Sequence, residues 1–230
     1  MDRRLTLEDV LLSAARLQAL VPDTVLVGDA AAAFHARHRE SFDHDHVLRD
    51  LVERYADVGE AVEASDGWVT SVRASSPPLT LLGSLDGIEA GLRQLRRTRP
   101  LEVERVEVAE LTLTVPTLPE CLRVKAYLVV QRNQVRDYLD TVALADKLGT
   151  EAAVEVLEGI DAFYSDRSEG DDSVLTSLVQ RLAEPSPRDV RVTRQLRSYK
   201  SLDARWHDWD AVTEACAVLA DRLLVAVEER

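Results

Sequence analysis

The sequence predicts an α+β fold, with an N-terminal domain over residues 1–115 that holds a mixed sheet and a C-terminal helical domain over residues 116–230. Short apolar runs bounded by turn residues alternate with helical patterns as far as about residue 115. Almost every later segment repeats its apolar residues at helical spacing. The 230 residues are 46% hydrophobic and 30% charged, which is ordinary for a globular chain that forms one large or two small domains.

Local signals place the N-terminal elements. Thr6, followed at the third position by Asp9, predicts the start of a helix that runs to Leu20. Pro22-Asp23 then turns into a short buried strand over residues 24–27, which Gly28 ends. The later elements that we expect are a helix at 29–37, a strand at 45–48, a helix at 48–64, strands at 68–72 and 79–82, and a helix at 88–97.

The second half begins with two strands and continues as helices. Residues 101–108 and 111–115 read as a strand pair. Pro119 suits the first turn of a long helix that extends to about Val130. After Asn133 almost everything is predicted to be helical, apart from an acidic surface loop over residues 165–172.

The charge is unevenly distributed. A net charge of −13 argues against non-specific binding to a nucleic-acid duplex, which requires a positive surface. Two basic clusters nevertheless stand out, and we expect each on a helix face, either solvated or facing a polyanion. They are Arg93, Arg96, Arg97 and Arg99, and, spaced by three, Arg188, Arg191, Arg194, Arg197 and Lys200.

The sequence gives no sign of a membrane or secretory segment. No apolar run is long enough to span a bilayer, and the residues after Met1 go straight into an amphipathic pattern. Cys121 and Cys216 are too few for a disulfide framework. We therefore expect a cytoplasmic protein.

An acidic pair is the central feature of the candidate site. If the chain from Asp43 to Val47 is extended, Asp43 and Asp45 point the same way, because side chains alternate along a strand. Two such carboxylates repel each other unless a cation lies between them. A hard divalent ion with oxygen ligands, Mg²⁺ or Mn²⁺, fits that position.

Nucleotidyl transfer would use further groups of this sequence. Gly28 stands where a strand turns into a helix, which lets the backbone approach phosphates. Lys125, on the long helix, could place a point charge on a triphosphate. Arg132 and Arg136 follow at the end of this helix or just beyond it, and Asp137 could pair with one of them.

These pieces together resemble a known family. The order Gly-x, then Ser-x-Asp-x-Asp beginning at Ser41, then a lysine helix ending in Arg-Asn-x-x-Arg-Asp-Tyr-x-Asp, is similar to the AbiEii/AbiGii-type nucleotidyltransferase toxins. These include the MenT-type toxins and belong to the DNA polymerase β superfamily. The similar stretch covers about half of the chain, residues 25–146, and the segment from Val115 to Asp140 is its most specific part.

The resemblance implies a polymerase-β-like fold that uses a nucleoside triphosphate with Mg²⁺ or Mn²⁺. It implies transfer of a nucleotide to an acceptor, which is the 3′ end of tRNA in characterised relatives, and a cognate antitoxin as partner. The implied catalytic residues are Asp43, Asp45, Lys125 and Asp137, with Asp43 and Asp45 as the metal ligands. The implied nucleotide-binding residues are Gly28, Asp29, Ser41, Arg132 and Arg136.

Two departures from the family pattern keep alternatives open. Asp29 stands where the family has a second small residue, and Leu79–Ser84 lacks the third carboxylate of the larger superfamily. The alternatives are an enzyme that modifies a small cationic molecule, as aminoglycoside nucleotidyltransferases do, and a degenerate, non-catalytic binding module. A zinc site is disfavoured, because His44 and His46 alternate with the aspartates and so point away from them.

Overall fold

The computed structural model describes residues 5–166 and 173–228, so most of the predicted acidic loop lies outside the described residues. The chain packs into two compact units. The α+β unit contains residues 1–34 and 40–117, and the helical unit contains residues 35–39 and 118–230. The predicted mixture of strands and helices followed by helices alone is confirmed.

The α+β unit is built on a five-stranded mixed sheet with the strand order β1-β2-β5-β4-β3. Strands β2 and β5 run parallel, and the other neighbours in this sheet are antiparallel. The strands are β1 (Val25–Val27), β2 (Asp43–Leu48), β3 (Trp68–Thr70), β4 (Thr80–Leu85) and β5 (Ile88–Gln94). The helices that the sequence predicted here are α1 (Leu7–Leu20), α2 (Gly28–Ala36) and α3 (Leu51–Glu63).

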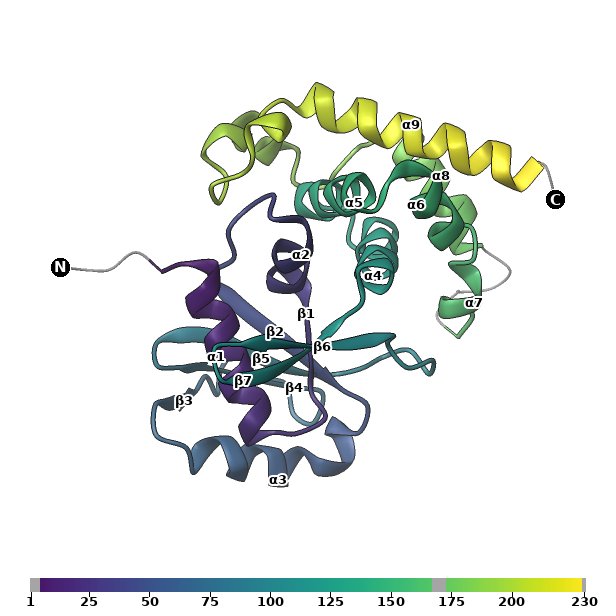
Figure 1. Cartoon of the computed structure of the whole chain (residues 1–230). Helices are drawn as coiled ribbons and strands as arrows, with labels where there is room; N and C mark the ends of the chain where they lie inside the picture. Colours follow the sequence, from purple (N-terminus) through teal and green to yellow (C-terminus); the bar gives the residue numbers. More distant parts are fainter. Residues whose placement is uncertain (1–4, 167–172, 229–230) are drawn as a thin grey trace. The chain divides into compact units, whose positions relative to one another are not determined.

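One face of this sheet carries the apolar core of the unit. Helices α1 (purple in Figure 1) and α3 (blue) pack on the same side of the sheet. Leu17 of α1 and Val58 of α3 join Leu48, Leu81 and Leu92 of the strands in one buried cluster. The predicted cap of α1 is present, since the Thr6 side chain and the Asp9 carboxylate bond to each other's backbone amides. Burial of one sheet face leaves polar residues on the other.

The predicted helix at 88–97 is wrong, because this segment forms the strand β5. Asp86 and Gly87 both have positive φ angles, 50° and 82°, and join β4 to β5 in a two-residue turn. Such a turn matches the twist of a hairpin and favours an Asp-Gly sequence. The hairpin then inserts β5 between β2 and β4, where alternating Ala90 and Leu92 face the core.

The prediction that four arginines share a face of that helix is also wrong. Arg93 lies on the strand β5, and the side chain of Arg97 is buried. Arg97 donates hydrogen bonds to the backbone carbonyls of Arg99 and Pro100, at 2.9 Å each. The four arginines therefore do not form a common solvated helix face.

A two-stranded ribbon completes the α+β unit. It consists of β6 (Val103–Val108) and β7 (Leu111–Pro116), as predicted. Gln18 of α1 ties the ribbon to the unit, because its side-chain amide exchanges two hydrogen bonds with the backbone of Thr114. The amide nitrogen donates to the Thr114 carbonyl at 2.9 Å, and the amide oxygen accepts from the Thr114 N–H at 2.7 Å.

The helical unit is built around an antiparallel pair of helices, α4 (Leu118–Gln131) and α5 (Val135–Leu148). Figure 1 shows the long C-terminal helix α9 (Trp209–Glu228, yellow) lying across this unit, and it contacts α5, α6 and α8. The smaller elements are α6 (Thr150–Leu157), α7 (Asp161–Tyr164), α8 (Val174–Ala183), η1 (Val190–Ser198) and η2 (Ala204–Trp206). None of the helices in the described ranges combines the length and the apolar composition needed to cross a bilayer.

Arg191, Arg194 and Arg197 of the second basic cluster lie on a 3₁₀-helix rather than on the predicted α-helix, and Arg188 and Lys200 lie just outside it. The segment η1 keeps 3₁₀ geometry over nine residues, and such runs rarely exceed three or four. With three residues per turn, side chains spaced by three stand directly above one another. Arg191, Arg194 and Arg197 therefore form a straight row, whereas an α-helix would wind them around its axis.

Candidate functional site

Strand β2 presents the two predicted metal ligands on the open face of the sheet. Asp43 and Asp45 pair in register with Glu89 and Gly91 of the parallel strand β5, so all four residues face the same side. They line a cleft of about 200 Å³ together with Arg93. The predicted common orientation of the two carboxylates is therefore present.

Glycines make room for the carboxylate of Asp45. A Cβ atom added to Gly91 would lie only 2.3 Å from Asp45 Oδ1. A Cβ on Gly28 would lie 3.6 Å from Asp45 Oδ2, and Gly28 has a φ of 74°, which favours glycine. The same carboxylate accepts a hydrogen bond from Arg93 Nε at 3.0 Å, and both side chains are partly exposed.

The other predicted residues of the α+β unit lie around this pair. The Ser41 hydroxyl, which is buried, donates to the backbone carbonyl of Asp43 at 3.1 Å and lies 3.4 Å from its Oδ1. Asp29 lies in the first turn of α2, directly after Gly28. A carboxylate is favoured there by the positive end of the helix dipole, which gives a structural reason for an acidic residue at this position.

A buried hydrogen-bond chain lies behind the aspartates. His44 and His46 point to the opposite face of β2, as predicted, and are almost fully buried. His44 Nδ1 lies 3.0 Å from His46 Nε2, His44 Nε2 lies 3.1 Å from Ser13 Oγ, and His46 Nδ1 lies 3.4 Å from Gln18 Nε2.

The orientation of Gln18 fixes the direction of this chain. Its amide nitrogen can only donate, so His46 accepts at Nδ1 and carries its proton on Nε2. His44 then accepts from His46 and donates to Ser13, so both imidazoles are neutral. Burial lowers the pKa of His44 to about 4, partly offset by Asp43, and burial with His44 nearby holds the pKa of His46 well below 6.5.

Lys125 lies in a buried cluster of the helical unit that is centred on Asp140. Its Nζ is 2.6 Å from Asp140 Oδ2, and neither side chain is more than 1% exposed. Arg39 binds both oxygens of the same carboxylate, at 2.9 Å each, and His38 Nε2 lies 2.8 Å from Oδ1. Asp140 therefore holds the predicted phosphate-binding lysine, and a phosphate would compete with this carboxylate for Lys125.

The corner between α4 and α5 carries the remaining predicted residues. Asp137 is buried, and its two oxygens accept from Arg132 and from the backbone N–H of Gln134. The second contact completes a capping box at the start of α5, which gives Asp137 a structural task. Arg136 Nε donates to the Gln134 side chain at 3.0 Å.

The donor set fits a hard cation that takes part of its shell from a substrate. Among the described residues, no group of three or more His, Cys, Asp or Glu side chains is arranged to hold a metal. Two carboxylates on the same sheet face suit Mg²⁺, which commonly uses one or two carboxylates plus phosphate oxygens and waters.

The roles of three residues in these clusters, Glu89, Arg93 and Asp140, were missed in the sequence analysis. Glu89 and Arg93 were hidden because their segment was predicted as a helix, although the Asp86-Gly87 pair marks a hairpin turn. Asp140 was quoted in the motif but given no role. Lys125 and Asp140 lie about equally far on either side of the α4–α5 corner, so their contact could have been predicted from this spacing.

Comparison with solved structures identifies the fold. A protein from Helicobacter pylori, solved as a candidate nucleotidyltransferase, is similar with a TM-score of 0.53 at 13% identity, over 96% of this chain and 95% of that chain. JHP933 from Helicobacter pylori has a TM-score of 0.52 at 14% identity, covering 95% and 91%. A nucleotidyltransferase-like antigenic protein from Paracoccidioides brasiliensis gives 0.51 at 14%, covering 87% and 95%. The chain therefore has a nucleotidyltransferase-like fold.

Sequence comparison gives a different set of relatives. No family model matches the chain. The heme uptake protein MmpL11 of Mycobacterium tuberculosis is 33% identical over 189 residues, which are 79% of this chain and 20% of that protein. The mycolic acid-containing lipids exporter MmpL11 of Mycolicibacterium smegmatis is 33% identical over 131 residues, covering 56% and 13%. The chain thus spans about a fifth or less of the length of these relatives.

Proposed function

We propose that this chain, with its nucleotidyltransferase-like fold, is a metal-dependent enzyme that transfers a nucleoside monophosphate from a nucleoside triphosphate to an RNA acceptor, the 3′ end of tRNA. The observation that carries the proposal is the placement of Asp43 and Asp45 on one open sheet face, with Gly91 leaving space for the Asp45 carboxylate. Two carboxylates on one strand face repel each other, and a cation between them relieves this repulsion.

The α+β unit provides groups for binding and orientation. A Mg²⁺ or Mn²⁺ ion on Asp43 and Asp45 would neutralise triphosphate charge and favour deprotonation of the acceptor hydroxyl. Ser41 restrains Asp43 through its hydroxyl, and Arg93 is partly exposed beside Asp45, where its guanidinium can reach a phosphate oxygen. Gly28 opens helix α2, whose N-terminus favours an anionic group.

The helical unit provides the proposed cations. Lys125 is held by Asp140, and Arg132 by Asp137, so both cations are restrained before any substrate binds. Restraint of a charged group reduces the reorganisation that accompanies the build-up of charge in a transition state. In this proposal Arg136 is a further phosphate contact, and Asp137 and Asp140 act as positioning residues.

A transfer assay tests the proposal. The chain is incubated with each labelled nucleoside triphosphate, Mg²⁺ or Mn²⁺, and total RNA, and incorporation is followed on a gel. Asp45→Asn should lower incorporation at least about 100-fold, since it removes a charge that stabilises the metal and the transition state. Asp57→Asn, an exposed aspartate of α3 in the same unit, should leave incorporation unchanged. Equal activity of the two variants would show that the metal site is misassigned.

The cognate antitoxin is the proposed protein partner, and the resemblance to the toxin family supports it. Induced expression of the chain should then inhibit growth, and Asp45→Asn should relieve that inhibition. Co-expression of the neighbouring gene product should also relieve it if that product is the antitoxin. Growth inhibition that persists with Asp45→Asn would separate toxicity from nucleotide transfer.

A small cationic acceptor is the second candidate, and the lining of the cleft favours it. Asp43, Asp45 and Glu89 place three carboxylates around a space of about 200 Å³. An amine-rich molecule would be attracted there, as it would be by the net charge of −13. Labelled transfer into a panel of aminoglycosides, run beside transfer into total RNA, distinguishes the two acceptors.

A non-catalytic binding module is the third candidate, and the ion pair between Arg93 and Asp45 favours it. The pair already neutralises one of the two metal-binding carboxylates. Titration of Mg²⁺ and nucleotide against tryptophan fluorescence should show nucleotide binding without turnover in this case. Turnover in the transfer assay would rule it out.

A further inference from the structure

The 3₁₀-helix η1 presents a single row of positive charge. We call Arg191, Arg194 and Arg197 the arginine ladder, and all three side chains are exposed. A 3₁₀-helix rises about 2 Å per residue, so successive members of the ladder are about 6 Å apart along one line. This spacing is comparable to that of neighbouring phosphates along a nucleic-acid strand.

The sequence and the backbone of this segment share a period of three. A second face of η1 carries Thr193 and Leu196. Leu196 is only 1% exposed, so this face packs against the helical unit. The cationic face therefore points away from the packed side. An α-helical backbone would spread the same arginines over more than one face, so the unusual geometry is what aligns them.

Carboxylates of the described residues do not neutralise the arginine ladder. In the described part of the chain, no carboxylate forms an ion pair with Arg191, Arg194 or Arg197. The nearby Asp189 accepts a hydrogen bond from the backbone N–H of Val135 at 2.8 Å, which fixes its carboxylate at the start of α5. Three aligned, exposed guanidinium groups are therefore available to an external anion.

The upstream end of the ladder is fixed to the corner that carries the candidate phosphate-binding arginines. The backbone N–H of Arg188 donates to the carbonyl of Asn133 at 2.8 Å. Asn133 directly follows Arg132, and Val135, which bonds to Asp189, directly precedes Arg136. An anionic strand on the ladder would therefore continue toward this corner.

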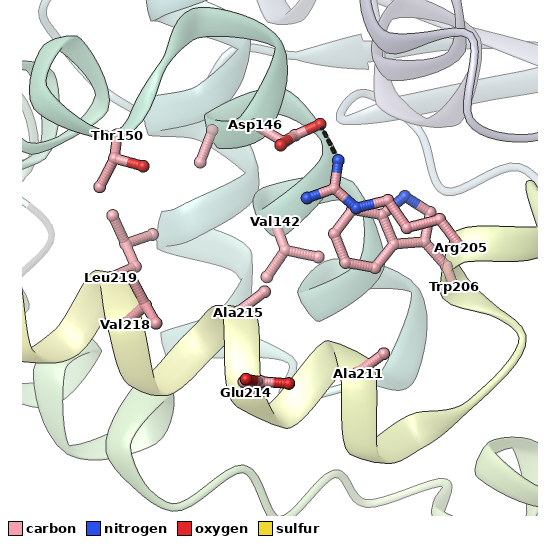
Figure 2. A pocket seen from close by; sticks show the side chains of 11 residues that line it. Val142, Asp146, Thr150, Arg205, Trp206, Ala211, Glu214, Ala215, Val218 and Leu219 are labelled. Carbon is pink, nitrogen blue, oxygen red and sulfur yellow. Dashed lines mark hydrogen bonds and ion pairs between the residues drawn. The ribbon is translucent and has the colours of Figure 1, made fainter.

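The segment that follows the ladder is tied to the cluster around Asp140. The backbone N–H of Asp203 donates to the carbonyl of His38 at 2.7 Å, and His38 contacts Asp140. Figure 2 shows how the short helix η2 is held, with Arg205 reaching Asp146 of α5 beside the ring of Trp206. The segments on both sides of the ladder are thus hydrogen-bonded to residues that adjoin the proposed site in this unit.

We propose that the arginine ladder binds the phosphate backbone of a single-stranded segment of the RNA acceptor, and this inference rests on the proposed function. A guanidinium group can donate two parallel hydrogen bonds to phosphate oxygens, so each arginine of the ladder can bind one phosphate. A single row matches one strand. A duplex or an anionic membrane would require a broad positive surface, which the net charge of −13 disfavours.

The test measures binding of a short fluorescent single-stranded RNA across a salt series, without nucleotide or metal. For single strands the slope of log K against log salt changes by about 0.7 per phosphate contact. The triple change Arg191→Gln, Arg194→Gln and Arg197→Gln should make the slope shallower by about 2 and weaken binding about 100-fold at about 0.1 M salt. Nucleoside triphosphate binding and the melting temperature should not change, because the three side chains are exposed.

Two controls separate geometry from total charge. Arg105→Gln, Lys147→Gln and Arg222→Gln remove three exposed cations from other elements and should leave the slope unchanged. Exchanging Arg194 and Gln195 preserves the charge but moves one rung to another face, so the slope should fall by about 0.7. The proposal would be overturned if the control triple variant lost as much RNA affinity and salt slope as the ladder variant, or if the exchange of Arg194 and Gln195 left the slope unchanged.

The remaining outcomes distinguish this inference from the proposed function. RNA binding that depends on the ladder, in a chain that never transfers a nucleotide, would overturn the function and keep the inference. If the chain transfers a nucleotide into RNA but the triple variant binds RNA as tightly as the wild type does, the inference is overturned and the proposed function is kept. Ladder-dependent binding to phosphatidylglycerol vesicles, with RNA binding unaffected, would also overturn the inference.

Discussion

Gly91 is the residue whose side chain, a single hydrogen, matters most to the shape of the acidic site. Gly91→Ala would place a Cβ atom 2.3 Å from Asp45 Oδ1, and the carboxylate is the end of a side chain that can rotate away. We expect nucleotide transfer to fall as far as it does with Asp45→Asn. The free energy of unfolding should change by no more than about 1–3 kcal/mol, the usual range for overpacking.

Gly59→Ala is the matched control for this change. Nothing lies within 4 Å of a Cβ atom at Gly59, which is inside helix α3. Alanine should stabilise this helix by roughly 0.5–1 kcal/mol and leave transfer unchanged. Urea unfolding and the transfer assay, applied to both variants, measure the two effects separately. Full activity of Gly91→Ala would mean that the observed position of Asp45 is not required.

Asp140 is the residue on which the buried charges of the helical unit depend. Asp140→Asn removes the negative charge shared by Lys125 and Arg39 while keeping nearly the same shape. Breaking a buried ion pair from one side typically costs about 3–5 kcal/mol. We expect a loss of that order in the free energy of unfolding, measured in urea. Asp146→Asn breaks an exposed pair with Arg205 and should cost no more than about 1 kcal/mol.

At the scale of single elements, the turn between β4 and β5 decides the topology of the sheet. Gly87 has a φ of 82°, and nothing lies within 4 Å of a Cβ atom built on it. Gly87→Ala therefore introduces backbone strain without a clash. We expect it to destabilise the α+β unit by about 1 kcal/mol, measured by urea unfolding. A variant as stable as the wild type would show that the turn tolerates a side chain at positive φ.

The types of most elements, but not all, could be predicted from the sequence. Strong periodic patterns gave the correct types for α1, β2, α3, β6, β7 and α4. The prediction for β5 was wrong because its residues, from Ile88 to Gln94, also fit a helical pattern. Only pairing with both neighbouring strands makes this segment a strand. The 3₁₀ geometry of η1 was missed because basic residues spaced by three are also neighbours on an α-helix, so the spacing alone does not distinguish the two helices.

The candidate site was predictable where it depends on alternation along one strand. The orientation of Asp43 and Asp45, and of His44 and His46 away from them, follows from the period of two. The groups that the pair meets on β5 depend on the register between strands distant in sequence, which no local pattern specifies. The partner of Lys125 was missed because it depends on how α4 and α5 pack.

At the scale of the whole molecule, the buried histidines should make stability depend on pH. His44 and His46 stay neutral in the folded chain, with folded pKa values of about 4 and well below 6.5, respectively. The unfolded chain takes up protons as the pH falls below 6.5, so the stability present above that pH is lost between about 6.5 and 4. Each histidine contributes roughly 1 kcal/mol per pH unit within this window.

Urea unfolding between pH 7.5 and 4.5 measures this dependence. The variant with His44→Gln and His46→Gln removes both titrating groups and should show a flatter profile over the same range. Its stability at neutral pH should be lower than that of the wild type, because the hydrogen-bond chain from Gln18 to Ser13 is interrupted. Parallel profiles of the two proteins would contradict the neutral, buried state of the histidines.

The helical unit is not one uninterrupted piece of the polypeptide, since residues 35–39 belong to it and residues 40–117 do not. A cut at residue 117 would therefore not release it whole. The C-terminal fragment would retain Asp140 and Lys125 but leave behind His38 and Arg39, and Asp203 would lose its backbone partner at His38. Recombination that transplants this unit into another protein must carry two separate stretches of coding sequence, so the two halves of the chain are constrained to be inherited together.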